Sequence, residues 1–215
     1  MPASAGMTGL SPDIDLALLH IPGRVRDSIA ALFAIDAAMA DVVARSTEPA
    51  LGRIKLAWWR EQLEALDERS PPAEPRLAAA AEHLIPLGVS GTELAKLETG
   101  WATLLDPDID DALVAARGAA LFEIAGRLLG GEDPMLGEAG ALYALVSVGR
   151  RGVPGLFGPA GESFDRLRGH RFARSVRPVT MLARASARDL TRQEPEASRG
   201  RIAAMLAHRW SGRIG

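Results

Sequence analysis

Two aspartates within one helix-forming segment, residues 32–45, are the first candidates for chemistry. Carboxylate oxygens are the ligands that Mg²⁺ prefers, and a metal held in this way can neutralise a negatively charged leaving group. Because successive residues of an α-helix are rotated by about 100°, Asp36 lies near the centre of the apolar face and Asp41 lies well to its side. A straight helix therefore cannot direct both carboxylates at one ion.

Two other segments carry polar side chains within their apolar stripes. Helical periodicity predicts one shared face over residues 50–68, made of Leu51, Ile54, Lys55, Trp58 and Gln62. It predicts another over residues 110–129, made of Leu113, Arg117, Ala120 and Ile124. Burying one unpaired charge costs on the order of several kcal/mol. These polar groups are therefore expected to find one another or to face a wet cavity.

Two interpretations remain open for these groups. In the first, an Asp36–Lys55 or Asp36–Arg117 ion pair fixes the register of the helices. In the second, the same side chains line a polar-bottomed pocket between helices, where Lys and Arg would suit an anion such as a diphosphate. The candidate pocket or anion-binding residues are Asp36, Lys55, Trp58, Gln62, Arg117 and Arg150. Trp58 and Trp59 are expected to be core residues rather than a platform for a ligand.

Several other kinds of site lack the residues that they need. The chain has no cysteine, which excludes disulfides, thiolate nucleophiles and Cys-ligated metals. Its four histidines are far apart, and no nucleotide-binding or nucleophile-elbow motif is present. The segment DPDIDD at 106–111 lacks the glycine and the distal glutamate of a calcium loop. Asp106 and Asp110 are instead expected to cap the helix that follows.

Charge is distributed unevenly along the chain. Residues 1–149 hold 11 basic and 22 acidic side chains, whereas residues 150–215 hold 14 basic and 5 acidic ones. The basic part is expected to pack against the acidic part; alternatively, residues 164–215 attract a protein partner or an anionic membrane surface. Nucleic acid is not an expected partner, because the arginines are not interleaved with aromatic residues. With no apolar run that could span a bilayer and no secretory signal, the expected location is cytoplasmic, at most peripheral to a membrane.

The sequence predicts a single all-α domain over residues 1–215. The chain is 47% hydrophobic but only 5% aromatic, is rich in Ala, Leu and Arg, and shows no convincing alternating pattern of a strand. The expected elements are a flexible N-terminus at 1–12, helices at about 24–45, 50–68, 76–85, 110–129 and 136–150, one starting from a capping box at Ser90 and Glu93, a Gly/Pro-rich loop at 150–163 and basic helices within 164–215.

Four segments, in this order and spacing, resemble the squalene/phytoene synthase family. They are ALFAIDAAMADVV at 31–43, EPALGRIKLAWWREQLEAL at 48–66, ARGAALFEIAGRLLG at 116–130 and GALYALVSVGRR at 140–151. GRIKLAWWRE is the most specific of these and is similar to a divergent branch that includes a mitochondrial complex I assembly factor. The resemblance covers roughly residues 14–151. It implies an isoprenoid-synthase-like helical bundle with a central cavity, truncated or degenerate at its C-terminal end.

The resemblance also implies what the family's enzymes need. They join two prenyl diphosphates using Mg²⁺ held by two aspartate-rich motifs, because Mg²⁺ neutralises the diphosphate as the allylic cation forms. At the first motif this chain reads Ala40-Asp41-Val42-Val43-Ala44, so only Asp41 remains. At the second motif the aligned positions are Ala144, Ser147, Arg150 and Arg151.

Loss of these aspartates favours a non-catalytic member of the family. The expected function is that of an assembly-factor-like, partner-binding or isoprenoid-binding protein that needs no cofactor or metal. The alternative is an active prenyltransferase of squalene/phytoene type, which would use Mg²⁺ or would hold the diphosphate with Lys55, Arg117 and Arg150.

Overall fold

The computed structural model describes residues 9–215, which form an all-α fold without strands. The helices are α1 (Pro12–Leu19), α2 (Gly23–Arg45), α3 (Pro49–Ala65), α4 (Pro75–His83), α5 (Gly91–Ala95), α6 (Leu97–Ala102), α7 (Asp111–Leu128), α8 (Leu136–Gly149), α9 (Phe157–Arg166), α10 (Arg177–Asp189) and α11 (Arg199–Ser211). Short 3₁₀ turns are η1 (Ile85–Leu87), η2 (Thr103–Leu105) and η3 (Pro154–Leu156). None of the helices within 9–215 is long and apolar enough to cross a membrane.

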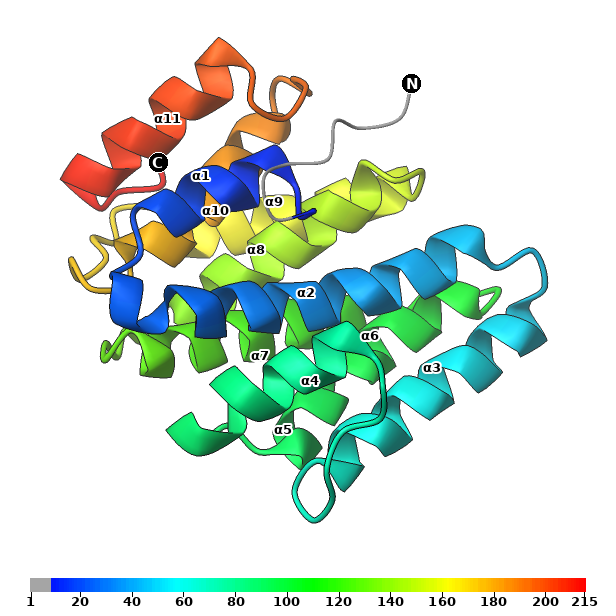
Figure 1. The fold of residues 1–215 in the computed structure, drawn as a ribbon. Coiled ribbons are helices and arrows are strands. Elements are labelled where there is room, and N and C mark those ends of the chain that lie inside the picture. Colours follow the sequence, from blue (N-terminus) through cyan, green and yellow to red (C-terminus); the bar gives the residue numbers. More distant parts are fainter. Residues whose placement is uncertain (1–8) are drawn as a thin grey trace.

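Three long helices, α2, α7 and α8, form the centre of the bundle (Figure 1). Helices α3 to α6 cover α2 and α7 on one side, and α1, α10 and α11 gather on the other side above α8. The core is mostly Leu, Ala, Ile and Val, and it runs without a break from α1 to the C-terminal residues. Residues 150–215 therefore pack onto the bundle instead of forming a separate arm.

Helices α7 and α8 approach each other closely at a pair of glycines. A Cβ added to Gly140 would lie 2.0 Å from the Gly118 carbonyl oxygen, and one added to Gly118 would lie 2.1 Å from the Gly140 oxygen. Since no side chain fits at this distance, the two backbones touch directly.

We predict that Gly140→Ala destabilises the protein by about 1–3 kcal/mol, because the helices must separate to admit the methyl group. Helix propensity acts in the opposite direction, by roughly 0.5–1 kcal/mol, and is outweighed. Urea unfolding followed by circular dichroism measures the difference. Gly161→Ala is the matched control: a Cβ there meets nothing within 4 Å in α9, so this variant should be neutral or slightly stabilised.

The predicted helices at 24–45, 50–68, 110–129 and 136–150 are confirmed, with small differences at their ends. Asp110 is the N-cap of α7 and accepts hydrogen bonds from the backbone N–H groups of Ala112 and Leu113. Asp106 does not cap this helix: its carboxylate accepts a hydrogen bond from Arg53, a partner 53 residues away that local sequence cannot indicate.

The capping box predicted at Ser90 is half confirmed. Ser90 Oγ accepts from the N–H of Glu93 at 3.0 Å. The Glu93 carboxylate binds Arg127 Nη2 instead, at 2.6 and 2.7 Å. A charged partner on α7 therefore replaces the backbone N–H that the capping box would have supplied.

The Gly/Pro-rich loop predicted at 150–163 is wrong from residue 157 onward, where α9 begins. Pro159 falls in the first turn of α9, where a backbone N–H has no partner within the helix and proline is tolerated. The flexible N-terminus predicted at 1–12 falls partly on residues 1–8, which lie outside the described residues. Of the remainder, Leu10 is buried and Ser11 caps α1.

The face of α3 that the sequence predicted to be buried lies outward. Its large apolar members, Leu51, Ile54 and Trp58, are 49%, 65% and 40% exposed, and Lys55 is exposed beside them. The buried stripe is one position further round the helix and consists of Gly52, Leu56, Trp59 and Leu63. Both stripes are apolar at helical spacing, so periodicity alone could not choose between them. The prediction that Trp59 belongs to the core is confirmed, and that for Trp58 is wrong.

Candidate functional site

Asp36 forms a buried ion pair at the centre of the bundle. Its Oδ1 accepts a hydrogen bond from Arg117 Nη1 at 2.6 Å and another from Trp101 Nε1 at 2.8 Å. The Arg117 side chain is fully buried, and its Cζ lies 3.9 Å from the centre of the Trp101 ring. Of the two ion pairs proposed from the sequence, Asp36–Arg117 is confirmed and Asp36–Lys55 is wrong. We call Asp36, Trp101 and Arg117 the central triad.

Aromatic rings and a second arginine surround the central triad. Tyr143 stacks on Phe122 with a centroid distance of 5.4 Å. Its burial, and then the negative charge of Asp36, raise the pKa of Tyr143 well above its usual range. Arg151, just after α8, places its Cζ 5.5 Å from the Trp101 ring centre. This environment keeps the phenol neutral, and the positive charges of Arg117 and Arg151 act on it together with the negative charges of Asp36 and Glu196.

Arg117 keeps some hydrogen-bonding capacity within the part of the chain that the structure describes. Its Nε and Nη2 are buried and donate no hydrogen bond there. The guanidinium is stabilised by one carboxylate and by the face of an indole, which favours a cation electrostatically. The triad can therefore fix the register of α2, α6 and α7, and its arginine has two N–H groups left for an oxygen acceptor.

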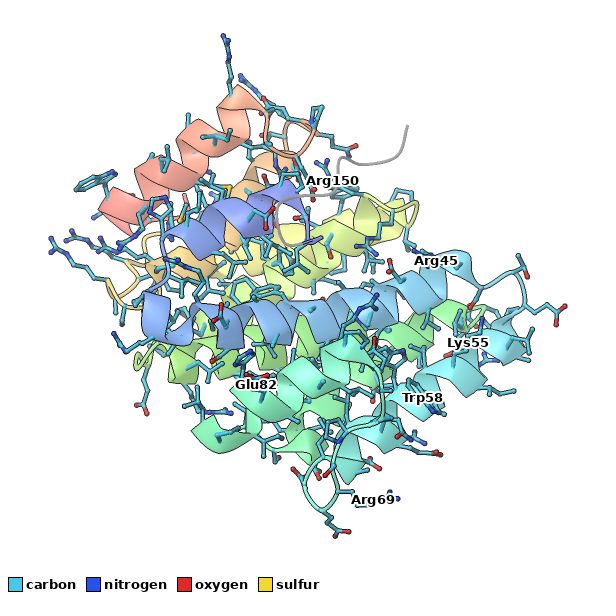
Figure 2. The ribbon with its side chains drawn as sticks, viewed as in Figure 1. Arg45, Lys55, Trp58, Arg69, Glu82 and Arg150 are labelled. Carbon is cyan, nitrogen blue, oxygen red and sulfur yellow. The ribbon has the colours of Figure 1, made fainter. Side chains whose placement is uncertain are left out.

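The other candidate pocket residues lie apart from the triad. Lys55 and Trp58 sit on the outer side of α3, whereas Arg150 lies at the far end of α8 (Figure 2). Gln62 is half-buried further along α3. Arg150 Nη1 lies 2.8 Å from Asp189 Oδ1. The structure thus brings together Asp36 and Arg117 from the candidate set, but not Lys55, Trp58, Gln62 or Arg150.

The position of the first aspartate-rich motif carries a single carboxylate, on the flank of α2. Asp41 lies 3.7 Å from Arg45 one turn away, and its side chain is about half exposed. Ala40 is buried and Ala44 is exposed. Asp41 thus lies off the apolar face, as the helical geometry predicts, and is a surface charge. Among residues 9–215, no three His, Cys, Asp or Glu side chains are arranged as ligands of one metal ion.

A second buried charge cluster, which the sequence analysis missed, joins the two ends of the chain. Arg201 of α11 donates to Asp13 Oδ2 of α1 from Nε at 2.8 Å and from Nη2 at 2.6 Å. Its Nη1 donates to Asp189 of α10, which also faces Arg150. We call Asp13, Arg150, Asp189 and Arg201 the terminal cluster. Arg201 shares the buried face of α11 with Ala204, Met205 and His208. A charged residue at helical spacing with these residues could have indicated a buried ion pair.

The terminal cluster supports the expectation that the basic part packs on the acidic part of the same chain. Arg201 pairs with Asp13, and Arg166 of α9 pairs with Glu138 of α8 at 2.9 Å. His170 lies 2.8 Å from Asp133. These contacts neutralise only part of the positive charge of residues 150–215.

His208 lies beneath α11 without exposure to solvent. Its Nδ1 lies 2.9 Å from the carbonyl oxygen of Arg213 and its Nε2 lies 2.8 Å from Thr180 Oγ1. Burial is the main cause that lowers the pKa of His208 to about 4, and the nearby charges of Arg177, Arg184 and Arg209 add to it.

We predict that the free energy of unfolding decreases as pH falls from about 6.5 to about 4. In this window the unfolded chain binds a proton on His208 and the folded protein does not, so protons favour unfolding; below it the effect levels off. A shift of this size corresponds to at most roughly 3 kcal/mol. Urea titrations across the window measure the slope, which His208→Gln should reduce.

Two surface hollows lie away from the central triad. One, of about 370 Å³, runs between α7, α8 and α9, and its lining includes alanines of α7 and α8 together with Glu138 and Arg166. The other, of about 540 Å³, lies at the end of α3 beside Asp67 and Thr92. Neither hollow is lined by Asp36 or Arg117.

Comparison with known proteins gives one match. The squalene/phytoene synthase family model matches residues 8–108, a range that contains helices α1 to α6 and the turns η1 and η2. This range contains the two quoted segments at 31–43 and 48–66, but not those at 116–130 and 140–151. No curated protein and no solved structure matches the chain significantly. The family has an all-helical isoprenoid synthase fold, in agreement with the all-α structure. Residues 8–108 of the chain are therefore similar to the squalene/phytoene synthase family.

Proposed function

We propose that this protein is a non-catalytic member of the squalene/phytoene synthase family that acts by binding a protein partner or an isoprenoid. The observation that carries the proposal is the state of α2, the helix of the first aspartate-rich motif. Of the two aspartates within residues 32–45 of this helix, Asp41 is paired with Arg45 at the surface, and Asp36 is paired with the buried Arg117.

The chemistry of the family explains why this observation matters. Ionising an allylic diphosphate requires cations that neutralise the leaving group, and Mg²⁺ clusters supply them when several carboxylates face one site. In the segment of α2 that would carry the motif, the carboxylate of Asp36 is buried and already neutralised by Arg117, and the carboxylate of Asp41 lies at the surface beside Arg45. At the aligned second motif, Arg151 stands at the position of a metal-binding aspartate and brings positive charge in its place. Both changes work against binding of a divalent cation.

The alternative function, an active prenyltransferase, would rely on Lys55, Arg117 and Arg150 to hold a diphosphate. These cations are separated: Lys55 is exposed on α3, Arg117 is paired with Asp36, and Arg150 faces Asp189. One observation favours ligand binding without catalysis, namely the two buried N–H groups of Arg117 that have no partner among residues 9–215. An anionic headgroup that reached them would also meet Arg151.

Calorimetric titration with farnesyl diphosphate, in Mg²⁺ and in EDTA, followed by product analysis, tests the proposal. Binding that is indifferent to EDTA and yields no product supports an isoprenoid-binding protein; Arg151→Gln should then weaken binding and Lys55→Gln should not. Absence of binding supports the partner-binding form of the proposal. Magnesium-dependent binding with formation of a coupled C30 product would show an active enzyme and would contradict the proposal.

The assembly-factor-like role rests on the resemblance to the divergent branch. Affinity purification of the tagged full chain under native conditions, followed by mass spectrometry, tests it. Recovery of the same subunits of one membrane complex in replicate experiments supports this role. Recovery of the chain alone, together with isoprenoid binding, would favour the ligand-binding form.

A further inference from the structure

The C-terminal end of α11 gathers arginines around one exposed tryptophan. Trp210 is 83% exposed, more than any other large apolar side chain among the described residues. We call this group the basic end: Arg171, Arg174, Arg209, Trp210 and Arg213. No carboxylate within residues 9–215 forms an ion pair with any of its four arginines. The positive charge of the basic end is therefore not neutralised by the described part of the chain.

Part of this charge has a structural role. Arg177 Nη1 donates to the Trp210 carbonyl at 2.7 Å, and Arg171 Nε donates to the Ser211 carbonyl at 3.0 Å. These bonds satisfy carbonyl groups that a helix leaves unpaired at its C-terminus. Burial, and then the charges of Arg171, Arg174 and Arg209, lower the pKa of Arg177, which shows how closely the cations are crowded.

The side chains of Arg174, Arg209 and Arg213 do not take part in capping the C-terminus of α11. The side chains of Arg174 and Arg213 make no hydrogen bond or ion pair within residues 9–215, and both residues are exposed. Arg209 Nε is buried without a hydrogen-bond partner in the same range. Holding several cations together at one helix end without counter-charges is unfavourable by itself. An anionic partner would relieve this repulsion.

The outer face of α11 carries no charge over its last two turns. Ala203, Ala207 and Trp210 follow at helical spacing, and each is exposed. Leu19, at the end of α1, is 58% exposed. The next residue, His20, is near enough to Arg209 for that charge to lower its pKa, after the larger effect of burial. The ends of α1 and α11 and the segment before α10 lie on one side of the molecule (Figure 1).

We propose that the basic end is a docking surface for an anionic lipid bilayer. Arginines near such a surface gain attraction from the acidic headgroups. An indole prefers the headgroup level, and an uncharged helix face can lie at the boundary with the acyl chains. A nucleic acid fits less well, because the exposed side chains of Ala203 and Ala207 offer no hydrogen-bond donor to a phosphate. This inference does not depend on whether the protein is catalytic.

Sedimentation of the purified full chain with vesicles tests the proposal. Vesicles of phosphatidylcholine alone are compared with vesicles that also contain phosphatidylglycerol. We expect binding to the anionic vesicles only, weakened by salt. Arg174→Gln with Arg213→Gln should lower the partition coefficient about 30-fold, at about 1 kcal/mol for each arginine. Trp210→Ala should weaken binding and abolish the shift of tryptophan emission to shorter wavelength.

Matched controls lie at the other end of the molecule. Lys55 and Arg69 are far from α11 in Figure 2, so Lys55→Gln with Arg69→Gln removes the same charge elsewhere. Trp58→Ala removes another exposed indole. Both controls should bind anionic vesicles as the unmodified chain does. Equal loss in the controls, binding to phosphatidylcholine alone, or absence of vesicle binding would overturn the proposal. So would binding of a single-stranded oligonucleotide, without vesicle binding, that the Arg174/Arg213 variant abolishes.

Discussion

Replacing Arg117 by methionine is expected to lower the free energy of unfolding by about 3–5 kcal/mol, the usual cost of removing one partner from a buried ion pair. Methionine keeps most of the volume of the side chain, so the loss reports charge rather than a cavity. Asp36, 6% exposed, would retain a hydrogen bond from Trp101 and lose its counter-charge. Urea unfolding followed by far-UV circular dichroism measures the change.

Two comparisons give this prediction its specificity. Asp36→Asn combined with Arg117→Met removes both charges, and should cost less than the sum of the single variants. Asp41→Ala with Arg45→Ala removes the exposed ion pair of the same helix and should cost less than about 1 kcal/mol. If Arg117→Met were no more destabilising than the exposed-pair variant, the central triad would not hold the three helices in register.

The second large effect is expected at Arg201. Arg201→Met leaves the carboxylates of Asp13 and Asp189, 3% and 1% exposed, without the guanidinium that lies between them. The loss should be at least as large as at Arg117, about 3–5 kcal/mol, because two buried charges lose one partner. Since α11 is attached to α1 and α10 through this residue, amide hydrogens of α11 should also exchange faster than those of α7.

Arg199→Met is the control, because Arg199 is exposed on the same helix and forms no ion pair within the described residues. Its stability and exchange should match those of the unmodified chain. A global loss of protection in Arg201→Met, equal in α7 and α11, would contradict the view that the terminal cluster mainly holds α11 in place. Retention of full stability would contradict the importance of the cluster altogether.

The sequence could predict the all-α class, and that Asp36 needs a buried partner, because both follow from local periodicity; it could not choose between Lys55 and Arg117. Asp36 interrupts an apolar stripe in a long segment, and an interruption of this kind requires a partner. The stripe of residues 110–129 contained that partner, Arg117. Trp101 was missed because an indole N–H in a short helix resembles any other core residue until its position relative to Asp36 is known.

The sequence could not decide which face of a helix is buried when two faces were equally apolar. Helix α3 has two apolar stripes one position apart, and only packing against α5 and α6 decides that Leu56 and Leu63 are buried. The ion pairs of the terminal cluster could not be predicted for a different reason. Their partners lie up to 188 residues apart, and the periodicity of one helix says nothing about which distant helix it meets.

The Asp13–Arg201 contact also affects the order in which the protein can fold. A bond that closes a loop of 188 residues is costly in chain entropy and forms after more local contacts have shortened the path between its ends. During synthesis, Asp13 leaves the ribosome long before Arg201 exists, so α1 must wait with its carboxylate in water. We expect the helices from α2 to α8 to assemble first, and the docking of α1 with α10 and α11 to be the slow, final step of folding.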